Sequence, residues 1–292
     1  MSVSEKTYKI IIPPEQAMPW QSYESMVLKE WNTLLSAANC EESVFQTFFE
    51  KHPCFLPMPH TVFLGSGHHG LFPSAVISQP TLTGLSSKRP DFLMIGRDSE
   101  SVYAIMIEIE SPCKQWFTKR GHPTSDLTMA INQLKDWQVW FKDPLNAEQF
   151  KRDYRISDEL LRFRSFEQRY LLIYGRRKEV ESSPNNKKRA RLTGTNEEFM
   201  TYDRLSPNKL SSNYLCVTID KNGYNAITIP PTVRLSPLRA KDYSIIRGKE
   251  ETVKKTAMIS KIRKNFLVRR WSYWDDWASR ANQGFIAVSD YE

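Results

Sequence analysis

The sequence has few cysteines and no CxxC pair. The four that it contains, Cys40, Cys54, Cys113 and Cys216, lie far apart along the chain. This spacing indicates neither a zinc ribbon nor a framework of disulfides. We therefore expect no disulfide framework and a reducing, intracellular setting.

Long apolar runs are also absent. The run Ile10–Ile12 has only three residues and ends at a pair of prolines, so it is too short for a signal sequence. No later run approaches the length that crosses a membrane. We expect a soluble, cytoplasmic protein with no membrane partner.

The chain nevertheless has enough apolar residues for a substantial core. It is 292 residues long, 40% of them hydrophobic and 12% aromatic, so one large domain or two small ones are both possible. Its 41 lysines and arginines exceed its 33 acidic residues, which gives a net charge of +8 and a pI near 9.2. This balance favours a polyanionic partner, such as nucleic acid or an acidic surface.

Two amphipathic helices are predicted near the N-terminus. Apolar residues at helical spacing mark the first, at residues 22–38. In the second, the spacing of Asn39 and Glu42 matches a capping box, and Pro53 ends the helix. Residues 54–87 are rich in proline, glycine and serine, so we expect an irregular segment there.

A β-hairpin is predicted from residues 91–95 and 102–110, which flank a polar turn. If Ile95 pairs with residue 103 or 104, the antiparallel ladder places Asp91 opposite residue 107 or 108. Carboxylates from both strands would then converge at one end of the hairpin.

The end of this hairpin contains an unusual pair of acidic residues. Because strand side chains alternate, Glu108 and Glu110 share one face and the neighbouring isoleucines fill the other. Burial of an ionised carboxylate is costly without a partner. The strand therefore either ends in water or holds a cation there.

The remaining segments predict helices and strands around the hairpin. A helix begins at a Thr or Ser cap near residue 124 and has Gln133 at the edge of its apolar stripe. Continuous apolar residues predict a central strand at 169–175, and Asn222-Gly223 predicts the turn of a second hairpin. The order strand, loop, helix is typical of an α/β fold.

Two basic segments have more than one interpretation. The composition of residues 181–198 favours a mobile loop over a phosphate contact or a nuclear address. Residues 249–281 predict one long helix with basic and aromatic side chains, including Trp271, Trp274 and Trp277. Such a helix packs on the body of the protein, joins subunits through a shared apolar patch, or contacts nucleic acid.

The acidic hairpin end has the layout of a divalent-metal nuclease site. Cleavage of a phosphodiester needs a cation that neutralises charge on the phosphate and promotes hydroxide formation near neutral pH. Carboxylate oxygens on a rigid sheet suit Mg²⁺. As a bare pattern, however, acidic residues near strand ends are also common on solvated edges.

Six motifs follow one another along the chain: EESVFQTFFEKHP, RPDFLMI, IEIESP, INQLKDW, RYLLIYGRR and FMTYDRL. In this order they resemble the Shedu immune nuclease family, over about residues 39–205. The resemblance implies a PD-(D/E)XK nuclease and bacterial defence against phage. It also implies an α/β fold that is restriction-endonuclease-like, with a central mixed sheet flanked by helices.

We expect three parts along the chain. An N-terminal helical segment at residues 1–38 precedes a PD-(D/E)XK nuclease-like domain at residues 39–245. A C-terminal helical extension at residues 246–292 would serve oligomerisation or nucleic-acid binding. The resemblance suggests a homo-oligomer, with the tryptophan-rich helix joining its subunits.

The resemblance also implies a site for Mg²⁺ or Mn²⁺. Asp91 and Glu108 would be the carboxylate ligands, and the carbonyl of Ile109 a further ligand. Glu110 stands where this fold usually has lysine, and a carboxylate there would act as a base or an extra ligand. Lys114, four residues further on, would supply a displaced amine.

Two helices would complete the catalytic set. Gln133 matches the family's helix glutamine, while Glu42 and Gln46 match the pair in the first helix. The alternatives are a capping role for Glu42 and a solvated position for Gln133. The expected contacts to nucleic acid are the basic residues near these motifs, Lys88, Arg89, Lys114, Lys119 and Arg120.

The leading interpretation is a metal-dependent DNA endonuclease that cuts or nicks invading DNA with a metal-activated water. The alternative is a DNA-binding or regulatory module of the same fold, catalytically defective because the lysine is absent. A third interpretation is an RNA-directed nuclease, since the core chemistry does not distinguish the sugars without a 2′-hydroxyl contact.

Overall fold

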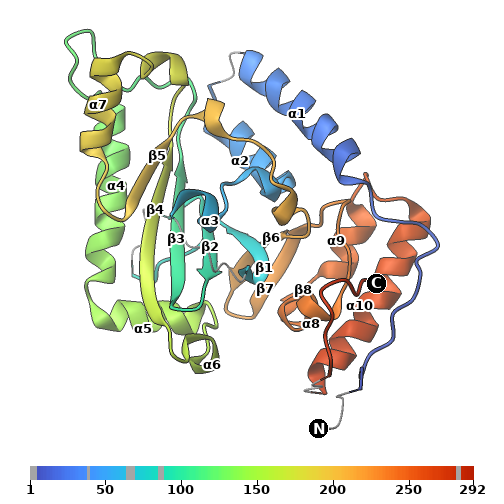
Figure 1. The fold of residues 1–292 in the computed structure, drawn as a ribbon. Coiled ribbons are helices and arrows are strands. Elements are labelled where there is room, and N and C mark those ends of the chain that lie inside the picture. The colour runs from blue at the N-terminus through green and yellow to red at the C-terminus, as the bar shows by residue number, and fades with distance from the viewer. Residues whose placement is uncertain (1–4, 38–39, 64–69, 85–88, 281–283) are drawn as a thin grey trace.

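The computed structural model describes residues 5–37, 40–63, 70–84, 89–280 and 284–292. Over these ranges, one eight-stranded mixed sheet forms the centre of the protein, in the order β5-β4-β3-β2-β1-β6-β7-β8 (Figure 1). Helices flank the sheet, and further helices lie at the C-terminal end. The predicted α/β fold is confirmed.

The bounds of the elements are as follows. The strands are β1 (Leu71–Ser78), β2 (Phe92–Arg97), β3 (Ser101–Ile109), β4 (Ser165–Ile173), β5 (Glu197–Met200), β6 (Leu215–Asp220), β7 (Gly223–Thr228) and β8 (Ile246–Arg247). The helices are α1 (Trp20–Ser36), α2 (Glu42–Lys51), α3 (Pro59–Val62), α4 (Ser125–Phe141), α5 (Pro144–Asp153), α6 (Asp158–Leu161), α7 (Ser183–Leu192), α8 (Pro237–Ser244), α9 (Lys249–Lys255) and α10 (Lys261–Ser279). In the described ranges, none of the helices is long and apolar enough to cross a membrane.

Strand β3 is held in register by a neighbour on each side. It pairs antiparallel with β2, with Phe92 opposite Ile107, and parallel with β4, with Ile109 beside Ile173. The connection from β3 to β4 contains α4, α5 and α6. Strands β3 and β4 therefore end at the same edge of the sheet, where β2 begins.

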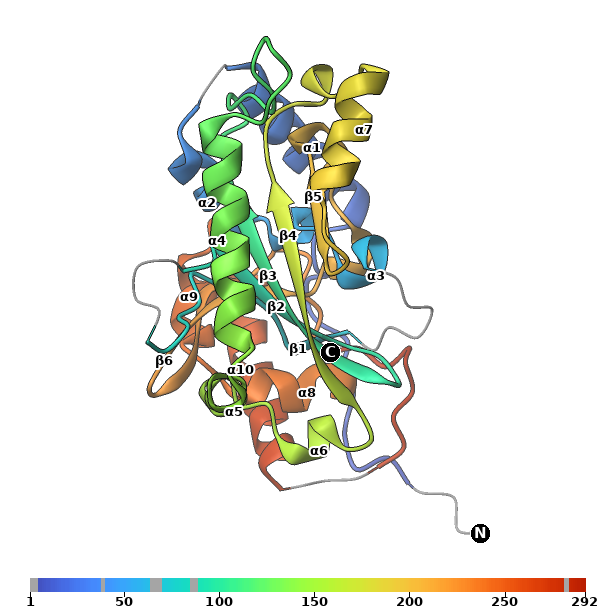
Figure 2. The same cartoon turned by 90° about the vertical axis from the view of Figure 1, so that its left-hand side faces the viewer.

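The two faces of the sheet bury separate apolar clusters. The isoleucines of β3 pack with residues of α1 and α2, whereas Ala104 and Met106 pack with residues of α4, α8 and α10. Figure 2 shows α4 in front of the sheet and α1 and α2 behind it. Because side chains alternate, Glu108 shares the face of Ala104 and Met106, as predicted, and α4 packs on this face.

Residues 54–87, expected to be irregular, contain a central strand. Strand β1 lies between β2 and β6 in the sheet. Its sequence includes Pro73, and its pairing with β2 shifts register between Phe72 and Ile77, so no regular alternation marks it. The strand forms because β2 and β6 supply its pairing, and β6 is distant in sequence.

The one long helix expected at residues 249–281 is instead two helices. Helix α9 ends at Lys255, and α10 starts after Ser260, whose hydroxyl accepts a hydrogen bond from the Arg263 amide at 3.1 Å. A side-chain cap of this kind satisfies an amide at the start of a new helix. The basic segment at 181–198, expected to be a loop, contains helix α7.

The three tryptophans of α10 belong to the core. Trp271, Trp274 and Trp277 are 1%, 1% and 4% exposed. Tyr8 packs against the latter two, with ring centroids 5.8 and 6.0 Å away. The prediction that this helix packs on the body of the protein is confirmed. The alternative, in which the three tryptophans form an apolar patch shared between subunits, is wrong because they are buried within the chain.

Loss of the Trp274 side chain should destabilise the protein strongly. Trp274→Ala removes a buried indole, so the free energy of unfolding should fall by about 3–5 kcal/mol. Ile262→Ala on the same helix is the matched control, because Ile262 is 58% exposed and its loss should cost less than about 0.5 kcal/mol. Denaturant unfolding followed by circular dichroism measures both; equal losses in the two variants would contradict this packing.

Candidate active site

Asp91 lies just before β2, opposite Glu108 of β3. Its amide donates to the carbonyl of Ile107 at 3.0 Å, and the pairing of Phe92 with Ile107 places residue 91 against residue 108. Its Oδ2 accepts a hydrogen bond from the Ile109 amide at 2.8 Å. The predicted pairing of Asp91 with residue 107 or 108 is confirmed.

Glu108 is buried and only half satisfied. The side chain, 8% exposed, accepts a hydrogen bond at Oε1 from Nε2 of Gln133 at 2.7 Å. Its Oε2 is buried and has no hydrogen-bond partner among the described residues. Helix α4 thus brings the side chain of Gln133, a predicted site residue, against Glu108. One carboxylate oxygen of Glu108 remains for a proton or a cation.

Burial raises the pKa of both facing carboxyl groups. The pKa of Glu108 lies well above its usual value because of burial, and the charges of Asp91 and Glu110 raise it further. Burial raises the pKa of Asp91 to about 7, and the charge of Glu42 adds to this, against the hydrogen bond from the Ile109 amide. Two buried like charges disfavour joint ionisation unless a cation lies between them.

Lys114 joins two more carboxylates beside this pair. Its Nζ lies 2.7 Å from Oε1 of Glu42 and also donates to Oε2 of Glu110. Burial raises the pKa of Glu110 to about 7, although the hydrogen bond from Lys114 opposes the shift. Burial lowers the pKa of Lys114, but the two carboxylates outweigh it and leave that pKa above its usual value.

The capping interpretation of Glu42 is wrong. Helix α2 begins at Glu42 itself, and the preceding residue, Glu41, makes no side-chain cap. The Glu42 carboxylate instead accepts hydrogen bonds from Lys114 and from the Ser111 amide at 3.3 Å. Asn39, the other member of the expected capping box, lies outside the described residues.

Gln46 belongs to a different hydrogen-bond network from Glu42. Its Nε2 donates to Glu50 and to Ser78, at 3.0 Å each, and the Ser78 hydroxyl donates to the same Glu50 oxygen. Ser78 pairs with Phe92 across β1 and β2. The two residues of the predicted pair, both in α2, therefore contact different segments. Glu42 contacts the loop after β3, and Gln46 contacts the end of β1.

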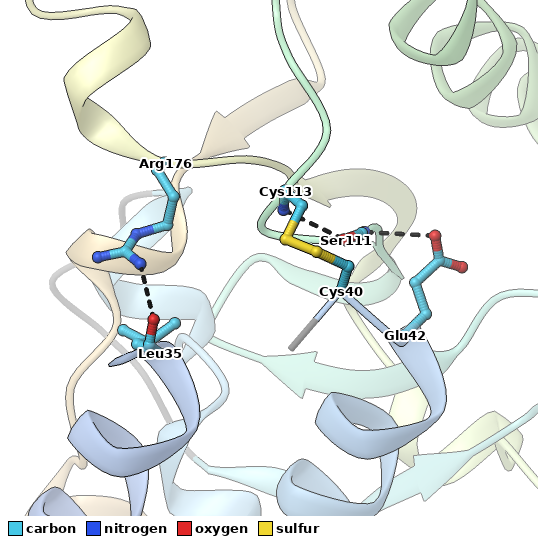
Figure 3. Close-up of a disulfide and its surroundings, with 6 residues drawn as sticks. All are labelled: Leu35, Cys40, Glu42, Ser111, Cys113 and Arg176. Atoms are coloured by element: carbon cyan, nitrogen blue, oxygen red, sulfur yellow. Dashed lines mark hydrogen bonds between the residues drawn. A yellow bond between two sulfur atoms is a disulfide. The ribbon is translucent and has the colours of Figure 1, made fainter. Parts of the chain in front are cut away.

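A disulfide crosses the site, contrary to the expectation from cysteine spacing. Cys40 and Cys113 are bonded, with Cα atoms 5.4 Å apart, although 73 positions separate them in sequence. Figure 3 shows the bond joining the segment before α2 to the loop after β3, beside Glu42 and Ser111. The spacing along the chain gave no sign of it, because folding of the sheet brings the two segments together.

Tyr202 is a site residue that the sequence-based set omits. It is fully buried, and its hydroxyl donates to the backbone carbonyl of Glu110 at 2.5 Å. This bond fixes the chain where β3 leaves the sheet. The signal was present, because Tyr202 belongs to the motif FMTYDRL, but nothing in that motif indicated its partner.

The structure describes four of the five expected nucleic-acid contacts. Arg89, Lys119 and Arg120 are exposed, and Lys114 is held by its two carboxylates. Lys88 lies outside the described residues. Three of the four are therefore surface cations, and Lys114 belongs to the acidic cluster.

The facing carboxyl groups of Asp91 and Glu108 are the candidate donors for a divalent cation. No group of three or more His, Cys, Asp or Glu side chains in the described ranges is arranged to hold a metal. Asp91 and Glu108 nevertheless face each other, and the buried Oε2 of Glu108 lacks a partner. Mg²⁺ keeps several waters and is commonly held by one or two carboxylates plus substrate phosphate, a pattern that two facing carboxylates would match.

These features define a class: an α/β protein whose mixed sheet carries an acidic cluster at the end of a central hairpin. A protein-family model described as Shedu protein SduA, C-terminal, matches residues 39–206 of the 292. The chain therefore belongs to the Shedu family, and this membership implies a role in defence against phage. Among curated proteins, none matches the chain.

The acidic cluster should make the metal-free protein less stable as pH rises. A carboxyl group with a raised pKa in the folded state stabilises the protein below its unfolded pKa, and this contribution disappears as pH rises through the folded pKa. Asp91 and Glu110, with folded pKa values of about 7 against usual values of 3.8 and 4.5, place the window between about pH 4 and 8.

Glu108→Gln tests this pH dependence. The variant cannot ionise at the most buried position, so its unfolding free energy relative to wild type should increase steadily from pH 5 to 8 in the presence of a chelator. Glu148→Gln is the control, because Glu148 lies on the exposed face of α5. Urea unfolding at each pH gives the free energies; a constant difference between Glu108→Gln and wild type would contradict the burial argument.

Proposed function

We propose that the protein is a metal-dependent endonuclease that cuts or nicks DNA in defence against phage. The observation that carries this proposal is the buried, unpartnered Oε2 of Glu108 opposite Asp91. A buried carboxylate oxygen of this kind is satisfied either by a proton shared with the facing Asp91 carboxyl or by a cation. A divalent cation bound there would satisfy that oxygen and remove the repulsion within the pair.

Three backbone and side-chain positions would hold the metal. Asp91 and Glu108 would supply carboxylate oxygens, and Ile109 its carbonyl. Bound there, Mg²⁺ or Mn²⁺ would supply positive charge at the scissile phosphate and lower the pKa of the attacking water.

Neighbouring residues hold these ligands in place. Gln133 donates to Oε1 of Glu108, so that only Oε2 remains without a partner among the described residues. The Ile109 amide fixes Oδ2 of Asp91. Both hydrogen bonds orient a proposed ligand before substrate arrives.

Glu110 is the proposed proton acceptor in place of the usual lysine. Its pKa of about 7, raised by burial, suits a general base near neutral pH. Lys114 holds one oxygen of this carboxylate and keeps its own proton, as its raised pKa indicates. Lys114 therefore positions Glu110 and contributes positive charge, and the attacking water gives its proton to the carboxylate.

A basic surface formed by the loop between β3 and α4 and by α7 suits a DNA backbone. Lys119 and Arg120 are exposed on the loop between β3 and α4, and Lys188 of α7 donates to the Gly121 carbonyl at 2.9 Å. Helix α7 also exposes Lys187 and Arg191. This surface supports phosphate binding that does not depend on sequence.

Neutral, nearly isosteric variants of the two ligands separate chemistry from folding. Asp91→Asn and Glu108→Gln should lower the cleavage of supercoiled plasmid in Mg²⁺ by at least about 100-fold, because each removes a charged ligand. Both should still bind duplex DNA in a mobility-shift assay. Glu148→Gln is the control and should cleave at the wild-type rate; wild-type cleavage by both ligand variants would refute the metal site.

The roles of Glu110 and Lys114 differ in their expected effects. Glu110→Gln should lower cleavage about 100-fold or more, as loss of a general base does. Glu110→Lys restores the usual residue of the fold and should retain more activity than Glu110→Gln. Lys114→Met should keep measurable activity and move the pH–rate profile, since it frees Glu110 without removing it.

Lys151→Met is the matched control for Lys114, because Lys151 pairs with Glu148 on the surface of α5. Plasmid cleavage from pH 5.5 to 9 gives the profiles. An unchanged profile in Lys114→Met would contradict the proposed link between Lys114 and Glu110.

One observation favours a second candidate, a DNA-binding module without catalysis. Glu110 replaces the usual lysine, and Lys114 already occupies one of its oxygens. Wild-type protein that binds DNA but leaves plasmid intact in Mg²⁺ and in Mn²⁺ would establish this second function instead.

A further inference from the structure

The disulfide between Cys40 and Cys113 is open to solvent. Both residues are exposed, and they line a cavity of about 560 Å³ together with Glu42, Ser111 and Lys114. The cavity also reaches the start of α4. A reductant can therefore approach the bond from the side on which the acidic cluster lies.

The other two cysteines are neither exposed to solvent nor joined in a disulfide. Cys54 and Cys216 are buried and unbonded. Burial raises the pKa of Cys54 to about 12 and that of Cys216 well above its usual value. Thiol exchange requires a thiolate and access, so reactivity is confined to the Cys40–Cys113 pair.

Short contacts connect this pair to Glu42 and Glu110. The Cys113 amide donates to the Ser111 hydroxyl at 3.1 Å, and the Ser111 amide donates to Glu42 at 3.3 Å. The same oxygen of Glu42 accepts from Lys114, which also donates to Glu110. Figure 3 shows the disulfide, Ser111 and Glu42 side by side at the start of α2.

We propose that Cys40 and Cys113 form a thiol–disulfide exchange site that controls the position of Glu42 beside the acidic cluster. In the oxidised protein, a covalent bond and the Lys114 ion pair both tie the start of α2 to the loop after β3. In the reduced protein, the ion pair and the weak Ser111 contact remain, and a partly exposed ion pair holds two segments only loosely. The effect of this control on cleavage rests on the proposed nuclease function.

The exchange needs a dithiol as its reductant. One thiolate of the dithiol attacks a sulfur of the Cys40–Cys113 bond and forms a mixed disulfide, and the other cysteine leaves as a thiolate. The second thiol of the dithiol then breaks the mixed disulfide. The dithiol becomes a disulfide, and its two protons and two electrons pass to Cys40 and Cys113, which end as thiols.

The first test measures structure and not activity. Alkylation of the native, full-length protein should label neither Cys40 nor Cys113 before treatment with dithiothreitol and both after it, with Cys54 and Cys216 unlabelled throughout. Hydrogen exchange in residues 40–46 and 111–116 should then be at least about fivefold faster after reduction. Residues 144–153 of α5 serve as the internal control and should not change.

The double variant Cys40→Ser/Cys113→Ser separates the bond from other effects of reductant. It should exchange rapidly in both segments, with or without dithiothreitol. Labelling of Cys40 and Cys113 before reduction, or equal exchange in oxidised and reduced wild type, would overturn the proposal.

A second test measures cleavage of supercoiled plasmid in Mg²⁺. Oxidised wild type should cleave at least about threefold faster than reduced wild type, and the double variant should match the reduced rate under both conditions. Equal or faster cleavage after reduction would overturn the control of catalysis. Absence of cleavage in both states would refute the nuclease function, and the exchange measurements would still decide whether the bond positions the start of α2.

Discussion

The register of the β2–β3 hairpin is the constraint on which the site depends. Pairing of Phe92 with Ile107 places Asp91 opposite Glu108 at the point where the sheet is covered by α4. A shift of one residue would turn Glu108 to the other face, among the isoleucine partners of α2. The apolar packing of both faces therefore fixes two facing carboxyl groups in a largely buried place, and the raised pKa values follow from that placement.

A second set of contacts attaches α2 to this hairpin. Lys114 bridges Glu42 and Glu110, and the Cys40–Cys113 bond lies beside it. A disulfide stabilises the folded protein by restricting the unfolded chain. For a loop of this length, the chain-entropy model gives about 4 kcal/mol of stabilisation. The covalent tie thus dominates over a partly exposed ion pair, which is worth about 1 kcal/mol or less. The geometry around Glu42 consequently depends on the oxidation state of two cysteines.

Much of the fold near the site could be predicted because its signals are local. The hairpin, the helix that carries Gln133 and the turn at Asn222-Gly223 all appear near the expected positions. Elements without local signals were missed. Strand β1 lacks regular alternation and depends on pairing with β6, and the break between α9 and α10 depends on the Ser260 cap within a continuous helical pattern.

By itself, the sequence determined which carboxylates lie at the end of the hairpin, since strand alternation and antiparallel pairing follow from spacing alone. It also determined the family, through six motifs in a fixed order. Only the tertiary structure decided what each side chain contacts: that Glu42 bonds Lys114 and not its own helix end, that Tyr202 holds the Glu110 carbonyl, that Trp274 is buried, and that Cys40 meets Cys113. The physical reason is that these contacts join segments far apart in the chain, and their distances are set by the packing of helices on the two faces of the sheet.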